Sequence, residues 1–221
     1  MNNRVTLVGS YGGDLTHAQS AWTSTYRDLD ADKLDRIPQM LKSLAENGHH
    51  TPFEKSDLHF LVTCDTASHI HLLKHRIGVS INAESARYKE LKDDKFYVPT
   101  DWPEKTQRML DTRMNEAYFI YRRTINELEN SGISRKRAKE SARFLLPYAN
   151  QITMDVSFNF RSFMHFQGLR NKPEAQLEIR DIAQSMLELT KGTGEFNLSL
   201  KAFGYEEKVE KKAIIVSKSL K

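Results

Sequence analysis

A run of basic and polar side chains over Lys74–Tyr88 (KHRIGVSINAESARY) is the stretch of this chain best suited to bind a ligand. It places lysine, histidine and arginine beside hydroxyl, amide and carboxylate groups. This mixture suits a phosphate-bearing ligand, because cations bind the anion while neutral donors and acceptors bind the rest. Its short apolar alternation is too brief for a core element, so a site is the better interpretation. A solvated basic loop would have the same composition, and the local sequence leaves both readings open.

Arginines lie in four separate polar patches, each bordered by apolar residues: Arg76 and Arg87 within this stretch, and Arg143 and Arg170 further along the chain. Arginines fixed in this way indicate buried recognition of phosphates rather than a diffuse cationic surface. Arg143 follows a helical pattern and either extends to solvent or is held for an anion; nothing local decides between the two.

The chain lacks the usual equipment of covalent and metal catalysis. The glycines near residues 9–13 match no phosphate-loop pattern, and no nucleophile elbow is present. Cys64 is the single cysteine and lies in a strand-like run, so a structural thiol is expected. His49 and His50 are adjacent but have no ligand partners at a metal spacing, so no metal site is predicted. If the protein is an enzyme, a cofactor carries the difficult chemistry.

The composition is that of a folded globular protein. Its 221 residues, 39% of them hydrophobic, suggest a single domain over residues 1–205, followed by a lysine-rich tail over residues 206–221. The formal net charge of +4 is compatible with phosphorylated ligands. We expect a cytoplasmic protein without a membrane span, since no apolar run approaches the required length and the N-terminus does not resemble a secretory signal.

Periodicity predicts more helices than strands. Strands are expected at Val5–Gly9, Asp57–Cys64 and Ile152–Phe158. Helices are expected over residues 14–26 with Asp14 as N-cap, 35–47, 67–76, 105–130, from Ser134 to before Pro147, from Phe160 to a turn at Gly168, 174–191 and 198–203. The predicted class is α+β, a mostly antiparallel sheet flanked by helices.

These residues together resemble the flavin-dependent thymidylate synthases. That family's signature is a basic-His-Arg triplet, a short spacer, a serine and a nearby Arg-Tyr, which corresponds here to Lys74–Arg76, Ser85 and Arg87–Tyr88. Similar segments follow in the same order along most of the chain: DLTHAQSAWTS, GHHTPFEKSDLHF, ARFLLP, NFRSFMHFQGLR and EAQLEIR. Their shared order makes the joint resemblance specific.

The resemblance implies a homotetramer with active sites shared between subunits, which converts dUMP to dTMP. FAD is the implied cofactor, with NADPH as reductant and methylene-tetrahydrofolate as the one-carbon donor. The implied flavin-binding residues are Ser24, His49, Thr51, Glu54, Lys74, His75, Arg76, Asn159, Arg161 and His165. The implied nucleotide-binding residues are His71, Glu84, Ser85, Arg87, Arg143 and Arg170.

Among these, Arg170 and Ser85 are the implied catalytic residues. Arg170 is placed to polarise the uracil ring, so that no enzyme thiol need attack it. Arg87 and Arg143 are directed to the dUMP phosphate, and Arg76 to a flavin phosphate or ring oxygen.

Several residues depart from the family pattern around the ligands. The spacer between Arg76 and Ser85 is one residue longer than usual, which places Glu84 directly before the serine. The triplet begins with lysine, His71 replaces a frequent glutamine, and His165 replaces a frequent asparagine. A relative that modifies another pyrimidine nucleotide is therefore a second hypothesis. A nucleic-acid-binding module that uses Phe158, Phe160, Phe163 and Phe166 for stacking is a third, of a different class, although neither nucleic acid nor a membrane is the expected partner.

Overall fold

The structure, a computed structural model, describes residues 2–24, 34–85, 90–91 and 95–205. It contains a four-stranded sheet in the order β1-β2-β4-β3, and each neighbouring pair of strands is antiparallel. The strands are β1 (Arg4–Tyr11), β2 (Asp57–Asp65), β3 (Val79–Ala83) and β4 (Gln151–Asn159). With the helices that pack on it, this sheet confirms the predicted α+β class.

Alternation along the strands separates a buried face of the sheet from a more polar one. On β2, Leu58, Phe60 and Val62 are fully buried, whereas Leu61 between them is 39% exposed. Successive side chains of a strand point to opposite faces, so this pattern marks one face as the core side. The other face carries polar cross-strand pairs, among them His59 Nε2 and Asp155 Oδ1 at 3.0 Å.

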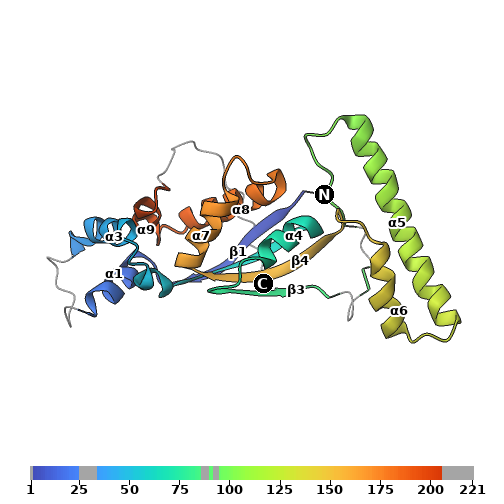
Figure 1. Cartoon of the computed structure of the whole chain (residues 1–221), viewed down its shortest axis with the longest axis horizontal. Helices are drawn as coiled ribbons and strands as arrows, with labels where there is room; N and C mark the ends of the chain where they lie inside the picture. The colour runs from blue at the N-terminus through green and yellow to red at the C-terminus, as the bar shows by residue number, and fades with distance from the viewer. Residues whose placement is uncertain (1, 25–33, 86–89, 92–94, 206–221) are drawn as a thin grey trace, which may run out of the picture.

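Helices α7 and α8 lie over the sheet, whereas α5 and α6 stand at one end of it (Figure 1). The helices are α1 (Asp14–Trp22), α3 (Ile37–Glu46), α4 (Thr66–Leu73), α5 (Glu104–Asn130), α6 (Arg135–Ala142), α7 (Phe160–Arg170), α8 (Leu177–Lys191) and α9 (Asn197–Ala202). Two short 3₁₀ segments, η1 (Thr51–Glu54) and η2 (Arg143–Leu145), complete the described elements.

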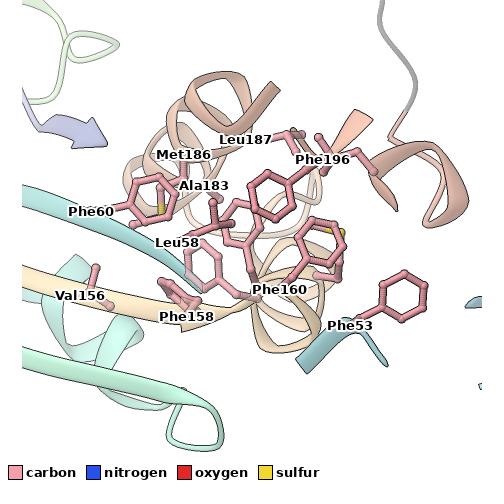
Figure 2. Close-up of a cluster of buried hydrophobic side chains, with 14 of the residues drawn as sticks. Phe53, Leu58, Phe60, Val156, Phe158, Phe160, Ala183, Met186, Leu187 and Phe196 are labelled. Carbon is pink, nitrogen blue, oxygen red and sulfur yellow. The ribbon is translucent and has the colours of Figure 1, made fainter. Parts of the chain in front are cut away.

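The main core is rich in phenylalanine (Figure 2). Phe160, the first residue of α7, stacks on Phe196 with ring centroids 5.3 Å apart, and it also packs against Phe53 of η1. Phe158 and Phe163 are fully buried as well, and so is Phe166. The rings that a nucleic-acid module would use for stacking are thus core residues, which contradicts that hypothesis.

A buried histidine ties three of these segments together. His17 of α1 is fully buried, its Nδ1 is 2.8 Å from Ser199 Oγ, and its Nε2 is 2.6 Å from Ser56 Oγ. Asp14 Oδ2 and Oδ1 accept hydrogen bonds from the backbone N–H groups of Leu198 and Ser199, at 2.8 and 2.7 Å. The expected N-cap role of Asp14 on its own helix is therefore wrong: Gly13 is the N-cap, and Asp14 holds the start of α9.

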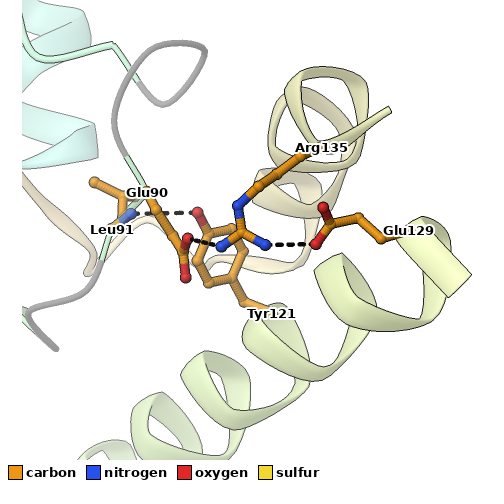
Figure 3. Close-up of polar contacts among 5 residues, drawn as sticks. All are labelled: Glu90, Leu91, Tyr121, Glu129 and Arg135. Carbon is orange, nitrogen blue, oxygen red and sulfur yellow. Dashed lines mark hydrogen bonds and ion pairs between the residues drawn. The ribbon is translucent and has the colours of Figure 1, made fainter. Parts of the chain in front are cut away.

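A second, smaller core lies between α5 and α6. On α5, Met114, Tyr118 and Tyr121 are buried, at the four- and three-residue spacing of one helix face. Arg135 at the start of α6 pairs with both Glu90 and Glu129, and Leu91 N donates to the Tyr121 hydroxyl at 3.3 Å (Figure 3). These contacts fasten the segment at residues 90–91 to the helix pair.

Several predicted boundaries are wrong. The helix expected over 67–76 ends at Leu73, the helix expected to turn at Gly168 continues to Arg170, and the helix expected from 174 begins at Leu177. The stretch judged too irregular to pack contains β3, whose residues Val79–Ala83 pair with β4 at the edge of the sheet. The first helix, expected to end at residue 26, ends at Trp22 and has Thr23 as its C-cap. The tail lies outside the described residues.

Candidate functional site

The Lys74–Arg76 triplet lies just beyond the C-terminus of α4. Asp65 caps that helix, since its Oδ1 accepts from Ser68 N at 2.8 Å, and Lys74 is the residue that follows its last turn. Cations are favourable near a helix C-terminus, where the backbone carbonyls point outward. The helix ends earlier than predicted because the chain turns here into β3.

Gly78 makes that turn. Its φ of +63° lies in the left-handed region, which glycine adopts without a steric penalty. Its carbonyl accepts from Asn159 N at 2.9 Å, and a Cβ at this position would lie 2.8 Å from Asn159 Cγ. Asn159 in turn caps α7 by accepting from Ser162 N at 2.8 Å. Gly78 therefore packs against the start of α7, while His75 of the triplet contacts Phe166 and Arg170 further along the same helix.

His75 and Arg170 are joined directly across this contact. Arg170 Nε lies 3.1 Å from His75 Nε2, and the His75 ring meets the Phe166 ring edge-to-face, with centroids 5.0 Å apart. Burial, together with the smaller effects of the nearby Arg170, His165 and His71 charges, lowers the pKa of His75 to about 4. His75 is therefore neutral near pH 7 and accepts a hydrogen bond from the arginine.

A cavity of about 640 Å³ opens beside this pair. It is lined by all three residues of the triplet, by Arg170 and by His165. A second cavity of about 590 Å³ adjoins it, and the two share Ile77, Ser162, His165 and Leu169. Volumes of this size fit nucleotide-like ligands, and the cationic lining favours their phosphates.

The second cavity brings in Arg161, which forms an ion pair with Glu54 of η1. Arg161, His165 and Leu169 recur every four residues along α7, so they share its outward face. Five of the implied flavin residues thus line the two cavities, namely Lys74, His75, Arg76, Arg161 and His165. Glu54 joins them through its ion pair, and Asn159 through its cap and the Gly78 contact.

The remaining implied flavin residues lie apart from the cavity linings. Ser24 follows α1 and donates to the Ala21 carbonyl at 3.0 Å, and its side chain is exposed. His49 and Thr51 are exposed at the entry to η1. Their roles stay predictions.

The implied nucleotide residues divide between the cavity and other places. Arg170 lines the first cavity, and the pKa of His71 on α4 is lowered by burial and by the Arg170 charge. Glu84 Oε2 accepts from Thr153 N at 2.9 Å while Glu84 N donates to the Thr153 carbonyl, so its carboxylate continues the pairing of β3 with β4.

Of the other three nucleotide residues, Ser85 and Arg143 are described, and neither lines the two cavities of the single chain. Ser85 is half-buried directly after Glu84, and Arg143 is exposed at the start of η2. Arg87 falls outside the described residues. The nucleotide roles of all three stay predictions.

The sequence prediction missed several cavity-lining residues, among them His50, Ile77 and Ser162. Ser162 precedes His165 by three residues, so the helical period from His165 and Leu169 could have identified it. His50 was considered only as a metal ligand; its Nε2 lies 3.3 Å from the Ala45 carbonyl. Ile77 is 85% exposed in the turn, and no sequence pattern marks it.

Two kinds of feature are not found among the described residues. They contain no cluster of three or more histidine, cysteine or acidic side chains arranged to hold a metal ion. None of the helices in the described part of the chain combines the length and the apolar character that crossing a bilayer requires.

Comparison with known proteins agrees with the resemblance. The family profile described as thymidylate synthase complementing protein matches residues 6–193. A flavin-dependent thymidylate synthase of Pseudothermotoga lettingae is 30% identical over 191 residues, which cover 85% of this chain and 84% of that protein. One from Thermotoga neapolitana is 31% identical, with 84% of each chain covered.

A solved structure is similar as well. It is a UMP/dUMP methylase, PolB of Streptomyces cacaoi, bound with 5-bromo-UMP, with a TM-score of 0.74 and 26% identity over 93% of this chain and 96% of that one. The fold, the profile match and the identity over most of the chain agree, and the chain therefore belongs to the thymidylate synthase complementing protein family, that of the flavin-dependent thymidylate synthases.

Proposed function

We propose that this protein is a flavin-dependent thymidylate synthase that methylates dUMP to dTMP, with methylene-tetrahydrofolate as carbon donor and NADPH as reductant. The observation that carries the proposal is the meeting of the Lys74–Arg76 triplet with Arg170 in one nucleotide-sized cavity. Family membership supports the reaction, since the relatives carry that activity in their names.

FAD is the proposed cofactor, and the residues present fit it. Arg76 and Lys74 supply cations for its phosphates, Arg161 and His165 line the adjoining cavity, and Asn159 caps the helix that carries both. Ser24, His49, Thr51 and Glu54 are proposed as further contacts. When bound, the flavin supplies the hydride that completes the methyl group.

Arg170 is the proposed electrophilic residue. Its guanidinium is always charged and is held next to the cavity by His75, so it can stabilise negative charge that develops on the uracil ring. A thiol nucleophile is not needed and none is poised: Cys64 is fully buried, and burial together with the Asp65 charge raises the pKa of its thiol.

We further propose a homotetramer whose sites combine residues from several subunits. Arg143 supports this proposal, because it is exposed on η2 beside Phe144, which is 77% exposed, and Tyr148, which is 67% exposed. Large exposed aromatic side chains mark interaction surfaces. Across such a contact Arg143 would bind the dUMP phosphate of a neighbouring site, while Ser85 and Arg87 would bind it from their own chain.

A second candidate substrate has a specific observation behind it. The solved relative is described as a methylase of both UMP and dUMP, and this chain has a longer spacer before Ser85 and histidines at positions 71 and 165. The test is a panel of dUMP, UMP and dCMP, with the products identified by mass.

The main experiment begins with the spectrum of the purified protein. We expect a flavin absorbance that NADPH bleaches, and dTMP formation that requires dUMP and methylene-tetrahydrofolate. A protein that takes up no added FAD would refute the proposal. The Arg170→Ala variant should bind FAD and form no dTMP, and near-normal turnover in that variant would refute the role of Arg170.

A further inference from the structure

The hydrogen bond between Arg170 and His75 fixes the state of the histidine. Arginine has only donors and keeps its charge, so its Nε–H donates and His75 Nε2 must accept, at 3.1 Å. Nε2 therefore carries no proton. The low pKa of His75, caused first by burial and then by Arg170, His165 and His71, keeps the ring neutral.

In a neutral imidazole with an unprotonated Nε2, the proton is on Nδ1. Among the described residues, no hydrogen bond uses His75 Nδ1, and His75 lines the larger cavity. The Nδ1–H is consequently a donor left for an acceptor atom of a ligand.

The His75 ring that carries this donor is held in place by its surroundings. His75 is 8% exposed, its backbone N donates to the Leu72 carbonyl at 3.0 Å, and Phe166 packs edge-to-face against its ring. Arg170, in contrast, is the last residue of α7, where a long side chain has many conformations to lose. In the described part of the chain, His75 is the one hydrogen-bond partner of its guanidinium.

We propose that His75 is a positioning residue. It aims the Arg170 guanidinium into the cavity by accepting from Nε, and the tautomer that this requires directs Nδ1–H to an oxygen or nitrogen acceptor of the bound flavin. This inference rests on the proposed function. It assigns His75 a role in turnover in addition to the flavin contact expected from the sequence.

A matched pair of variants separates the two roles. Phenylalanine at position 75 keeps a ring against Phe166 but has no acceptor, whereas glutamine offers an amide oxygen near the place of Nε2. We expect His75→Phe to lower the kcat for dTMP formation by about 10- to 100-fold at saturating FAD. A loss of this size corresponds to the free energy of one hydrogen bond to a charged group. The KM for dUMP should change by less than about threefold.

The His75→Gln variant should recover most of that kcat, because it restores the acceptor. Both variants should bind FAD more weakly, because neither has the Nδ1–H. The control is His59→Gln, a substitution on the polar face of the sheet, which should leave kcat and FAD affinity unchanged. Equal kcat losses in the Gln and Phe variants would overturn the positioning role.

A double-mutant cycle tests whether His75 acts through Arg170. Lysine has no Nε–H, so in the Arg170→Lys background His75→Phe should lower kcat by less than about twofold further. Independent, multiplicative losses would overturn the proposal.

A spectroscopic measurement on the wild-type protein needs no turnover. The ¹⁵N shifts of the His75 ring should report the Nδ1–H tautomer, and an Nε2–H tautomer would overturn the inference. A wild-type protein that forms no dTMP would refute the proposed function, and the tautomer would still decide whether Arg170 is held in this way.

Discussion

Acid should destabilise this protein through His17, the buried histidine between Ser56 and Ser199. Burial lowers the pKa of His17 to about 4, against an ordinary value of 6.5. Between these two pH values the unfolded chain binds a proton that the folded chain excludes, so the free energy of unfolding falls as the pH falls. The loss begins near pH 6.5 and is complete below about pH 4.

The size of the effect follows from the interval between the two pKa values. It corresponds to about 3 kcal/mol over the whole range, of which about 2 kcal/mol is lost between pH 7 and pH 5. Protonation of His17 should affect the candidate site as well as the stability of the fold. His17 packs against Phe53 and Phe160, which adjoin Glu54 and Arg161 at the second cavity.

The assay is urea unfolding at pH 7, 6 and 5, at one fixed protein concentration, for the wild type and the His17→Gln variant. Glutamine does not titrate, so the variant should lose about 2 kcal/mol less than the wild type between pH 7 and pH 5. The quantity to compare is the change in the free energy of unfolding with pH, the slope, for each protein. Absolute stabilities are not compared, because glutamine also lowers the stability at pH 7 by packing less well.

A control and an opposing group complete the design. Thr63→Ser, on the other face of the sheet, changes no titrating group and should keep the wild-type slope. Burial raises the pKa of Asp14, which acts in the opposite direction, since a carboxyl with a raised pKa favours the folded state as the pH falls. Asp14 is present in every variant, so its contribution largely cancels when the slope of a variant is subtracted from that of the wild type. A His17→Gln slope equal to that of the wild type would refute the reasoning.

Three further predictions concern the site and its support. Gly78→Ala should lower the free energy of unfolding by about 1–3 kcal/mol because of its positive φ, and by more because the new Cβ would overlap Asn159, the cap of α7. Gly48→Ala is the control for the backbone contribution alone, since Gly48 has a φ of +72° and open space around it. Equal losses of the two variants in urea unfolding would exclude the overlap. Glu84→Gln should keep both the stability and the dUMP affinity of the wild type, because an amide oxygen can still accept from Thr153 N. An increase of about tenfold or more in the KM for dUMP, with unchanged stability, would instead identify Glu84 as a dUMP ligand. Phe160→Ala should cost about 3–5 kcal/mol by opening a cavity among buried rings, and calorimetry that finds no decrease in Tm would contradict this.

The sequence by itself determined the class of fold and the family, and it predicted a set of candidate ligand-binding residues. Strict alternation on residues 152–158 and helical spacing on α5 and α8 identify those elements, because a single buried face imposes the period directly on the chain. The ordered motifs identified the family because each motif provides a few polar groups that packing alone does not require.

The ends of the elements were decided by tertiary contacts. The helix predicted to include Lys74–Arg76 stops at Leu73 because Gly78 turns the chain onto Asn159, a residue 81 positions further along. Likewise, Asp14 caps α9 instead of its own helix because the fold brings Ser199 N to 2.7 Å from Asp14 Oδ1. Such partners are distant in sequence, so no local pattern encodes them.

The assembly of the site depended most on the tertiary structure. The sequence predicts His75 as a cofactor residue and Arg170 as a substrate residue, on segments 95 positions apart. Only the packing of α7 against the turn at Gly78 places Nε of one within hydrogen-bond distance of Nε2 of the other. A hydrogen bond depends on distance and direction at the scale of a single atom. The sequence therefore supplies the donor and the acceptor, and the fold decides that they meet.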